Sequence, residues 1–442
     1  MRLLVVSNLY PPNIVGGYER LCYDAVSGLV QRGHQLTVLT SSFGDKTEDF
    51  PGQKIHRSLR LLIGDGIYAP FAGGGAEREA INRANVATLQ QAIAEAQPDA
   101  IFAWNLFFLD RAMLDALAAS GRNVLLMLTD NWLLTVHRAE FWMRFFQEQV
   151  LGNNPFPPST PGACPARPRD GFAERAMRRL RGWLSGTATA AAPAAATGTA
   201  EAAIRYPLAA IFGSRFVRDL YDAGGIAFAR HKVVHNGVDQ MPYRDKLPRD
   251  RDTLIDPQEL RLLFVGRLVD LKGVQTAVEA LPLLDPGDLG VSRVHLRIVG
   301  DMRDAGYVRH LKDVIERTGC SARVTIEPPV PEPALFDLFQ AHDIYLFPSL
   351  YEPFSLTLIH ALACGIPTIA SRAGGNVEIV HDRETGLLFE KGSAQDLARA
   401  VRMLVSDPAL RAQVAARGQA RARTFTVDRM VSEMEEFLLQ NV

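Results

Sequence analysis

The chain has 442 residues, of which 47% are hydrophobic, and its 48 basic and 49 acidic side chains give a formal net charge of −1. This length predicts two or three domains, the apolar fraction excludes a disordered chain, and the balanced charge argues against general nucleic-acid binding. The four scattered cysteines fit no metal-site spacing and predict no disulfide framework, so we expect a cytoplasmic protein. No apolar run approaches the roughly 18–20 residues of a spanning helix.

The first part of the chain alternates short apolar runs with helical patterns. Strands are predicted at residues 2–7, 35–39, 100–103 and 124–128, and an amphipathic helix at 18–31. This alternation is typical of a doubly wound α/β sheet. Between the first strand and helix, Gly16 and Gly17 either let the backbone approach a ligand closely or form a simple tight turn. The turn lacks the G-x-G-x-x-G pattern, which argues against a dinucleotide dehydrogenase.

A polar segment follows the predicted strand at 124–128. Its Asp130 can accept a hydrogen bond or a proton from a hydroxyl, or it can cap the next helix. We interpret the nearby His137 as a surface or structural residue rather than a catalytic one.

Residues 138–205 are expected to be an insertion, partly of low complexity, in a first domain spanning residues 1–205. The segment from Phe172 to Leu184 places apolar side chains on one helical face and four arginines towards the other. Such a helix either lies on an anionic membrane surface or packs on its own domain or over the cleft. The aromatic run at 141–146 is a further candidate for an acceptor surface.

The α/β pattern restarts after residue 205. Strands are predicted at 209–212, 232–235, 261–265, 295–299, 323–326, 344–347 and 368–370. We expect residues 206–240 to complete the first domain and supply a hinge at 236–239. Residues 241–420 would form a second domain, followed by a C-terminal helix within 421–442. Ligands of such sheets bind beyond the carboxyl ends of the strands, here in a cleft between two facing domains.

The predicted strand at 261–265 ends near two cations. Arg267 follows the strand and Lys272 opens the next helix. Arginine binds a diphosphate bidentately and lysine binds it as a point charge, so the pair suits a diphosphate ligand. The alternative is a solvated loop with ordinary surface charges.

The stretch from Leu346 to Glu378 is the most informative part of the sequence. A strand ends at Pro348-Ser349, a loop carries Glu352, and a helix begins near Ser355 and stops at Gly365. A carboxylate beside a helix N-terminus can bind a sugar hydroxyl and a phosphate at one place. The alternative is an ordinary βαβ turn in which Glu352 is a solvated cap.

This stretch resembles the donor-site signature of retaining glycosyltransferases of family 4, which have the GT-B fold. The matching positions are Pro348, Ser349, Glu352, Pro353, Phe354, Leu358, Ala361, Ala363, Gly365, Pro367, Gly374, Gly375 and Glu378. The second glutamate of the family pattern is replaced by His360. The histidine of the family's His-Asp pair is replaced by Thr129, while its aspartate is retained as Asp130.

The resemblance implies two Rossmann-like, doubly wound domains facing across a cleft, with the helix within 421–442 crossing back to the first domain. It also implies transfer of a sugar from a nucleotide diphosphate sugar to an acceptor hydroxyl with retention of configuration. Glu352 would contact the sugar hydroxyls and Arg267 and Lys272 the diphosphate. The remaining donor contacts would be Gly16, Gly17, His360 and the backbone N–H groups of Phe354, Ser355 and Leu356.

His360 is expected to accept one ribose hydroxyl where a glutamate would accept two. Losing one charge-assisted hydrogen bond costs about 1.5–3 kcal/mol, or roughly ten- to hundred-fold in donor affinity.

No cofactor or metal is expected, because the short Asp250-Arg251-Asp252 match lies in a polar linker rather than at a strand end. The acceptor, the nucleotide base and the sugar stay open. One alternative is a non-catalytic relative that binds a nucleotide or a partner, favoured by Thr129 and His360. Another is a different GT-B enzyme, such as a sugar-nucleotide epimerase. Peripheral contact with the inner face of the membrane would use the segment from Phe172 to Leu184.

Overall fold

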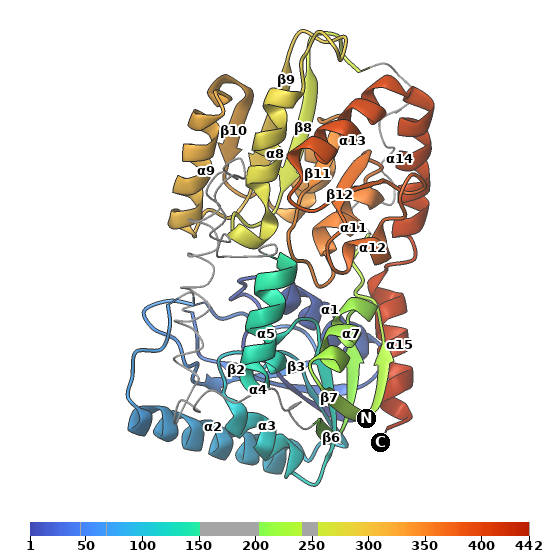
Figure 1. The fold of residues 1–442 in the computed structure, drawn as a ribbon. Helices are drawn as coiled ribbons and strands as arrows, with labels where there is room; N and C mark the ends of the chain where they lie inside the picture. The colour runs from blue at the N-terminus through green and yellow to red at the C-terminus, as the bar shows by residue number, and fades with distance from the viewer. Residues whose placement is uncertain (45, 68, 151–202, 241–254, 442) are drawn as a thin grey trace. The chain divides into compact units, whose positions relative to one another are not determined.

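The computed structural model describes residues 1–44, 46–67, 69–150, 203–240 and 255–441. The chain divides into two compact units. Unit 1 comprises Met1–His235 and Val427–Val442, and unit 2 comprises Asn236–Thr426. Each unit contains its own parallel sheet covered by helices, so the α/β fold class predicted from the sequence is confirmed (Figure 1).

The described part of unit 1 forms a seven-stranded sheet in the order β3-β2-β1-β4-β5-β6-β7, and each neighbouring pair is parallel. The strands are β1 (Arg2–Val6), β2 (Gln35–Ser41), β3 (Gln53–Leu59), β4 (Ala100–Ala103), β5 (Asn123–Leu128), β6 (Ile204–Phe212) and β7 (Ile226–Val233). The central strands β1, β4 and β5 are buried almost throughout, as expected for parallel strands covered on both faces. The strand order reverses between β1 and β4.

The helices of unit 1 follow most of these strands. They are α1 (Gly17–Gln31), α2 (Gly75–Ala96), α3 (Arg111–Ala118), α4 (Trp132–His137), α5 (Ala139–Phe145), a π-helical turn η1 (Phe146–Val150), α7 (Arg215–Ala223) and α15 (Val427–Leu439). The C-terminal α15 packs against α1, where a Cβ on Gly28 would lie 2.7 Å from a Val431 methyl group. Arg32 at the end of α1 is 2.8 Å from Glu435 of α15. The last helix therefore belongs to unit 1.

The described part of unit 2 forms a six-stranded parallel sheet in the order β10-β9-β8-β11-β12-β13. The strands are β8 (Leu260–Val265), β9 (Val294–Val299), β10 (Val324–Glu327), β11 (Ile344–Phe347), β12 (Thr368–Ser371) and β13 (Leu387–Phe389). Alternate side chains of β8 and β11 enter two separate apolar cores, one on each face of the sheet. Here the order reverses between β8 and β11.

Helices cover both faces of the second sheet. The α-helices are α8 (Val274–Ala280), α9 (Ala305–Arg317), α10 (Leu335–Gln340), α11 (Leu356–Ala363), α12 (Asn376–Ile379), α13 (Ala394–Ser406) and α14 (Pro408–Ala422). Short 3₁₀ turns are η3 (Asp270–Lys272), η4 (Leu281–Leu283), η5 (Ser321–Arg323) and η6 (Glu332–Ala334). The prediction that a helix begins near Ser355 and ends before Gly365 is confirmed by α11.

Sequence reasoning erred at the sheet edges. The bounds of the strand expected at 232–235 are wrong, because it overlaps only the last two residues of β7, which begins at Ile226 and ends at Val233. The edge strands β3 and β13 were not predicted. β3 is largely half-exposed and its sequence is mixed in polarity, and β13 has three residues, so neither carries a clear apolar pattern.

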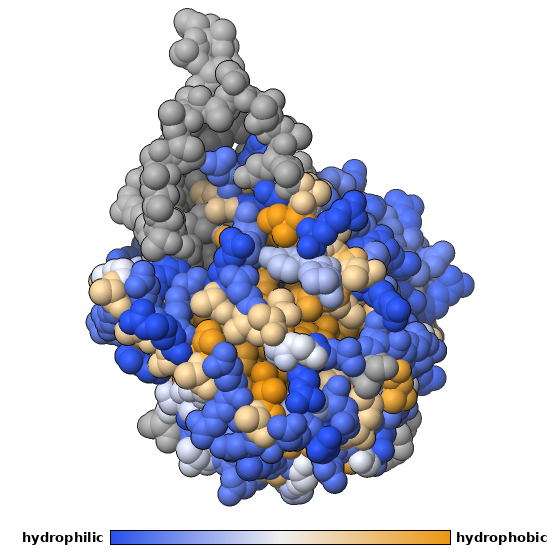
Figure 2. Space-filling view, turned by 90° about the horizontal axis from the view of Figure 1, so that it is seen from below, coloured by the Kyte–Doolittle hydropathy of each residue, from blue (hydrophilic) through white to orange (hydrophobic). Residues whose placement is uncertain are grey.

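Several expectations fall outside the described residues. These are the helix from Phe172 to Leu184, the low-complexity stretch of the insertion, and Asp250-Arg251-Asp252. Of the aromatic run that precedes them, Trp142 and Phe146 are buried. Within the described ranges, no helix has the length and apolarity to cross a bilayer. The face drawn in Figure 2 is mostly polar, with apolar side chains gathered near its middle.

Candidate functional site

The order reversal of the second sheet brings two predicted motifs to one edge. β8 leads into Gly266 and Arg267, and β11 leads into the loop that carries Glu352. Because β8 and β11 are hydrogen-bonded neighbours, their carboxyl ends lie side by side. Such a reversal is where open α/β sheets bind ligands.

Two glycines hold the loop that follows β11. Gly273 has φ +60°, and a Cβ there would lie 2.2 Å from the Pro348 carbonyl oxygen. On the other side, a Cβ on Gly375 would lie 2.1 Å from the Pro353 carbonyl oxygen. The Gly375 N–H also donates to the Glu352 carbonyl at 2.8 Å. The backbone of a glycine therefore packs closely against each end of the loop. Only a residue without a Cβ allows so close an approach.

Within this loop, Glu352 contacts Lys272, and the two form an ion pair. Their side chains are 8% and 15% exposed, so little water screens the charges. The ammonium also lies 5.3 Å from the centre of the Phe347 ring, and the Ser349 hydroxyl is 3.4 Å from the carboxylate. Two residues predicted separately, one for the sugar and one for the diphosphate, thus meet directly.

The start of α11 lies immediately after the loop. Ser355 is its N-cap, and the hydroxyl accepts a hydrogen bond from the Leu358 N–H at 3.1 Å. Phe354 is buried and packs edge-on against Phe425, with ring centres 5.5 Å apart. The first N–H groups of a helix lack partners within it, so those of Leu356 and its neighbour remain available to an anion.

His360 lies one turn after Leu356 on α11. Both residues and Thr357 are half-buried, whereas most of the helix is buried. His360 therefore belongs to the accessible face of the helix, on the side where its first turn is also accessible.

Arg267 is exposed beside the same strand end. Burial acts to raise the pKa of Asp301, but hydrogen bonds from Arg303, the charge of Arg303 and, less strongly, the charge of Arg267 outweigh it and hold that pKa below its usual range. The Asp301 carbonyl also accepts the Leu268 N–H at 2.9 Å. The guanidinium of Arg267 thus lies in an ionic neighbourhood at the carboxyl end of β8.

In unit 1, the glycine turn lies between β1 and α1. Gly16 is the N-cap of α1, and the buried Glu19 carboxylate accepts the N–H groups of Val15 and Gly16 at 3.1 and 2.9 Å. Gly17 is exposed. Sequence reasoning missed Glu19, although a glutamate three residues after an N-cap is a capping-box signal.

Asp130 accepts hydrogen bonds from Trp132 and Asn105. One oxygen accepts the Trp132 N–H at 3.0 Å, and the other accepts the Asn105 side-chain amide at 3.0 Å. The first bond fits the interpretation of Asp130 as a cap for α4. Each oxygen of a carboxylate has a second lone pair, so a substrate hydroxyl remains a feasible further partner. Thr129, at the position of the family's histidine, is buried.

Two buried asparagines connect these parts of unit 1, and sequence reasoning did not identify them. The Asn8 side chain accepts the Tyr18 hydroxyl at 2.9 Å and donates to the Phe107 carbonyl at 2.9 Å. Asn105 accepts the Phe107 N–H at 2.8 Å while donating to Asp130. Their signal in the sequence is a polar residue two positions after the end of a buried strand.

His137 is structural, as interpreted from the sequence. Its Nε2 atom is 2.9 Å from the Tyr206 hydroxyl. Burial lowers the pKa of His137 to about 4, so the imidazole is neutral near pH 7.

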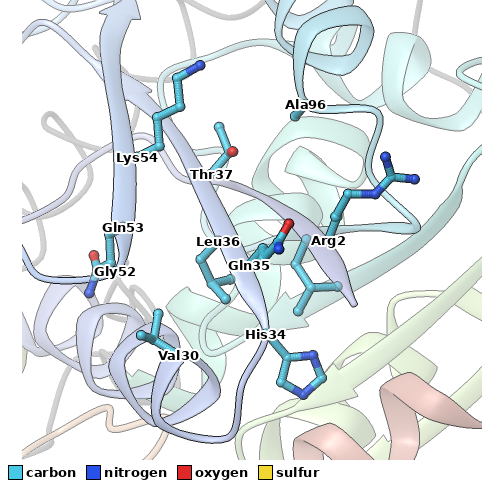
Figure 3. Close-up of a pocket in the computed structure, with 11 residues that line it drawn as sticks. Arg2, Val30, His34, Gln35, Leu36, Thr37, Gly52, Gln53, Lys54 and Ala96 are labelled. Atoms are coloured by element: carbon cyan, nitrogen blue, oxygen red, sulfur yellow. The ribbon is translucent and has the colours of Figure 1, made fainter.

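A separate pocket of about 550 Å³ lies in unit 1. Figure 3 shows it at the amino ends of β1, β2 and β3, where Arg2, Gln35 and Lys54 line it. Ligands of such sheets bind at the opposite, carboxyl edge. None of the predicted site residues lines this pocket.

No group of three or more His, Cys, Asp or Glu side chains in the described parts of the chain is arranged to hold a metal ion.

Two family models match the chain. Glycosyltransferase Family 4 matches residues 15–153, and Glycosyl transferases group 1 matches residues 246–421. A D-inositol 3-phosphate glycosyltransferase of Rhodococcus opacus is 36% identical over 204 residues, covering 45% of this chain and 45% of that one. The protein of the same name from Streptosporangium roseum is 36% identical over 216 residues, covering 47% and 49%. The matched stretch spans about half the length of these relatives.

Solved structures resemble the whole chain. Sucrose-phosphate synthase from Thermosynechococcus elongatus has a TM-score of 0.70 at 19% identity, with 99% of this chain and 98% of that chain covered. Anabaena HepE, solved in complex with UDP-glucose, has a TM-score of 0.64 at 20% identity, with 99% of each chain covered. At these identities the likeness shows a shared fold.

Proposed function

The chain belongs to glycosyltransferase family 4 and has the GT-B fold, and from that membership we propose that it transfers a sugar from a nucleotide diphosphate sugar to an acceptor hydroxyl with retention of configuration. The observation that carries this proposal is the cluster at the order reversal of the second sheet. There a loop gripped by Gly273 and Gly375 presents Glu352 in contact with Lys272, directly before the start of α11.

When the donor binds, its diphosphate would replace Glu352 as the ion-pair partner of Lys272. The proposed phosphate contacts are Arg267, Lys272 and the first N–H groups of α11, including that of Leu356. These groups stabilise the negative charge that develops on the leaving diphosphate. This stabilisation lowers the activation barrier without a protein-bound metal. Released from the ammonium, Glu352 would accept hydrogen bonds from the sugar hydroxyls. The carboxylate is well placed for this, because its loop is fixed before any donor arrives.

Unit 1 is proposed to supply the acceptor side. Asp130 would accept a hydrogen bond from a hydroxyl of the sugar or the acceptor, with Asn105 and the Trp132 N–H fixing its carboxylate. Gly16 and Gly17 would let the α1 turn approach the donor phosphate closely. His360 would accept one ribose hydroxyl from the donor.

The test is a thermal-shift panel of UDP-, GDP- and ADP-sugars, with and without EDTA, on wild type and Lys272→Ala. We expect one nucleotide to stabilise the wild type, EDTA to leave the shift unchanged, and the substitution to abolish it. Turnover is then followed by release of the nucleotide diphosphate, with inositol 3-phosphate among the acceptors because of the relatives' names. The anomeric proton signal of the product reports retention or inversion.

A non-catalytic nucleotide-binding protein is the second candidate, favoured by Thr129 and His360 at two positions where the family has other residues. Binding of a nucleotide with no release of sugar to any acceptor or to water would establish that candidate. Loss of the thermal shift in EDTA would contradict the metal-independent donor site.

A further inference from the structure

Three buried polar side chains connect the Glu352 loop to the neighbouring strand and helix. Ser349, Ser371 and Asn376 are each fully buried. Ser371, the last residue of β12, donates its hydroxyl hydrogen to the Ser349 carbonyl. Asn376, the first residue of α12, donates its side-chain amide to the Ser371 carbonyl at 3.1 Å and to the Ser371 hydroxyl at 3.3 Å.

The direction of these bonds fixes the Ser371 hydroxyl. It accepts from Asn376 and donates to Ser349, so both of its roles are used and its rotation is restricted. The Ser349 backbone is thereby fixed from the β12 side, and its own hydroxyl points to Glu352 at 3.4 Å. The next residue, Leu350, is fixed from the other side by its N–H bond to the Leu271 carbonyl at 2.8 Å.

We propose that Ser371 and Asn376 are positioning residues that set the orientation of the Glu352 carboxylate toward the donor sugar. This inference rests on the proposed function. Neither side chain can touch a substrate, because both are buried, so their effect passes through Ser349 and the loop. Hydrogen bonds between buried groups restrict the geometry of the loop that they hold, and displacements of about 1 Å at a reacting centre reduce rates by roughly a hundred-fold.

The first experiment compares Ser371→Ala with Ser393→Ala. Ser393 is the N-cap of α13 in the same unit, and its hydroxyl accepts the Asp396 N–H at 3.1 Å, so its loss weakens the fold away from the loop. We expect Ser371→Ala to lower kcat roughly ten- to hundred-fold. The Kd of the free nucleotide diphosphate should change less than about twofold, since that ligand lacks the sugar. Ser393→Ala should leave kcat unchanged.

The second experiment separates positioning from a general loss of stability. Each deoxy analogue of the donor lacks one sugar hydroxyl. The analogue that lowers kcat of the wild type as much as Glu352→Gln does identifies the hydroxyl that Glu352 binds. With that analogue, Ser371→Ala should have almost no further effect on kcat, because the contact that it misaligns is already absent. With every other analogue, it should retain its full effect. If Ser371→Ala does not fold, Ser371→Cys keeps the volume while weakening both hydrogen bonds.

A loss of kcat that is equal for all donors, or equal to that of Ser393→Ala, would overturn the positioning role and leave the proposed function intact. A wild-type protein that binds nucleotide sugars but transfers nothing would overturn the proposed function, and the inference with it.

Discussion

Lys272 and Glu352 come from different strand-to-helix connections, 80 residues apart, and their charged groups are in direct contact. Each is proposed to bind the donor, yet without a donor each neutralises the other in a site where both are largely buried. The attraction within the pair therefore offsets the free-energy cost of burying two charges, each of which would destabilise the fold if it were buried alone.

Removing both partners of this ion pair should destabilise the protein by less than the sum of the two single removals. We expect Lys272→Met to lower the free energy of unfolding by about 3 kcal/mol, because it leaves a buried carboxylate unpaired. Lys272→Met combined with Glu352→Gln should cost less than the sum of the two single changes, with a coupling of about 1–3 kcal/mol in urea denaturation. The matched control is Arg293→Met, which breaks the more exposed Arg293–Glu259 pair and should cost less than about 1 kcal/mol. Strict additivity at Lys272 and Glu352 would contradict the importance of the contact.

Gly273 is expected to be intolerant of any side chain. Gly273 and Gly290 have similar positive φ angles, +60° and +67°, but only at Gly273 would an added Cβ meet other atoms, 2.2 Å from the Pro348 carbonyl oxygen. Gly290→Ala should therefore lower the free energy of unfolding only by the conformational cost of a left-handed residue, about 1–2 kcal/mol. Gly273→Ala should lower the free energy of unfolding by at least about 2 kcal/mol more than Gly290→Ala, since the Glu352 loop must move. Equal losses in thermal or urea unfolding would show that the loop yields easily.

His360→Glu should strengthen nucleotide binding. A carboxylate there would accept two ribose hydroxyls, so we expect roughly ten- to hundred-fold tighter binding by calorimetry. The control is Thr357→Glu, which places the same charge on the same accessible face of α11. An unchanged Kd for His360→Glu, or an equal gain for Thr357→Glu, would rule out a specific ribose contact at this position.

Asp130 has two candidate roles that substitutions can separate. Asp130→Asn keeps an oxygen for the Trp132 N–H but removes the charge, whereas Asp130→Ala removes both. If Asp130 binds a substrate hydroxyl, both variants should lose activity, by roughly a hundred- to ten-thousand-fold, on the scale typical of a positioned acid–base group. If it only caps α4, Asp130→Asn should retain most activity and Asp130→Ala should lose about 1 kcal/mol of stability. Initial rates and urea unfolding of the two variants decide between these roles.

The stability of unit 1 should fall in acid because of His137. Its pKa is lowered by burial to about 4 in the folded protein, against about 6.5 in an unfolded chain. Between these values the unfolded state binds more protons, so the free energy of unfolding decreases as the pH falls from about 7 to 4. The loss should be about 2–3 kcal/mol and should be smaller in His137→Gln, which cannot titrate. An identical pH dependence in the two proteins would assign the acid sensitivity to other groups.

Much of the second unit was predictable because its strands are buried on both faces. Runs such as Ile344–Phe347 are apolar throughout, and the following Ser355 is a strong N-cap signal, so the bounds of β11 and α11 followed from local sequence. The edge strand β3 escaped notice because an edge strand need not be apolar on both faces, and β13 because three residues are too few to form a pattern.

The contacts within the site were less predictable than its residues. Lys272 and Glu352 were each identified from its own motif, but their pairing depends on β8 and β11 being neighbours in the sheet. The same holds for Asn8, Asn105 and Ser371, each of which bonds to a residue in another strand-to-helix connection of its sheet. A polar residue at a strand end shows that a partner exists, and only the strand order shows which one.

The backbone passes from unit 1 to unit 2 at Asn236 and returns at Val427, and the two connections meet. The Val238 N–H donates to the Phe425 carbonyl at 3.0 Å, and Val238 pairs with Thr426 in a parallel bridge. Unit 2 is thus a continuous insertion, whereas unit 1 needs α15 to cover α1. During synthesis, unit 2 can complete its fold as soon as it emerges from the ribosome, while unit 1 keeps one face of α1 uncovered until the last helix arrives.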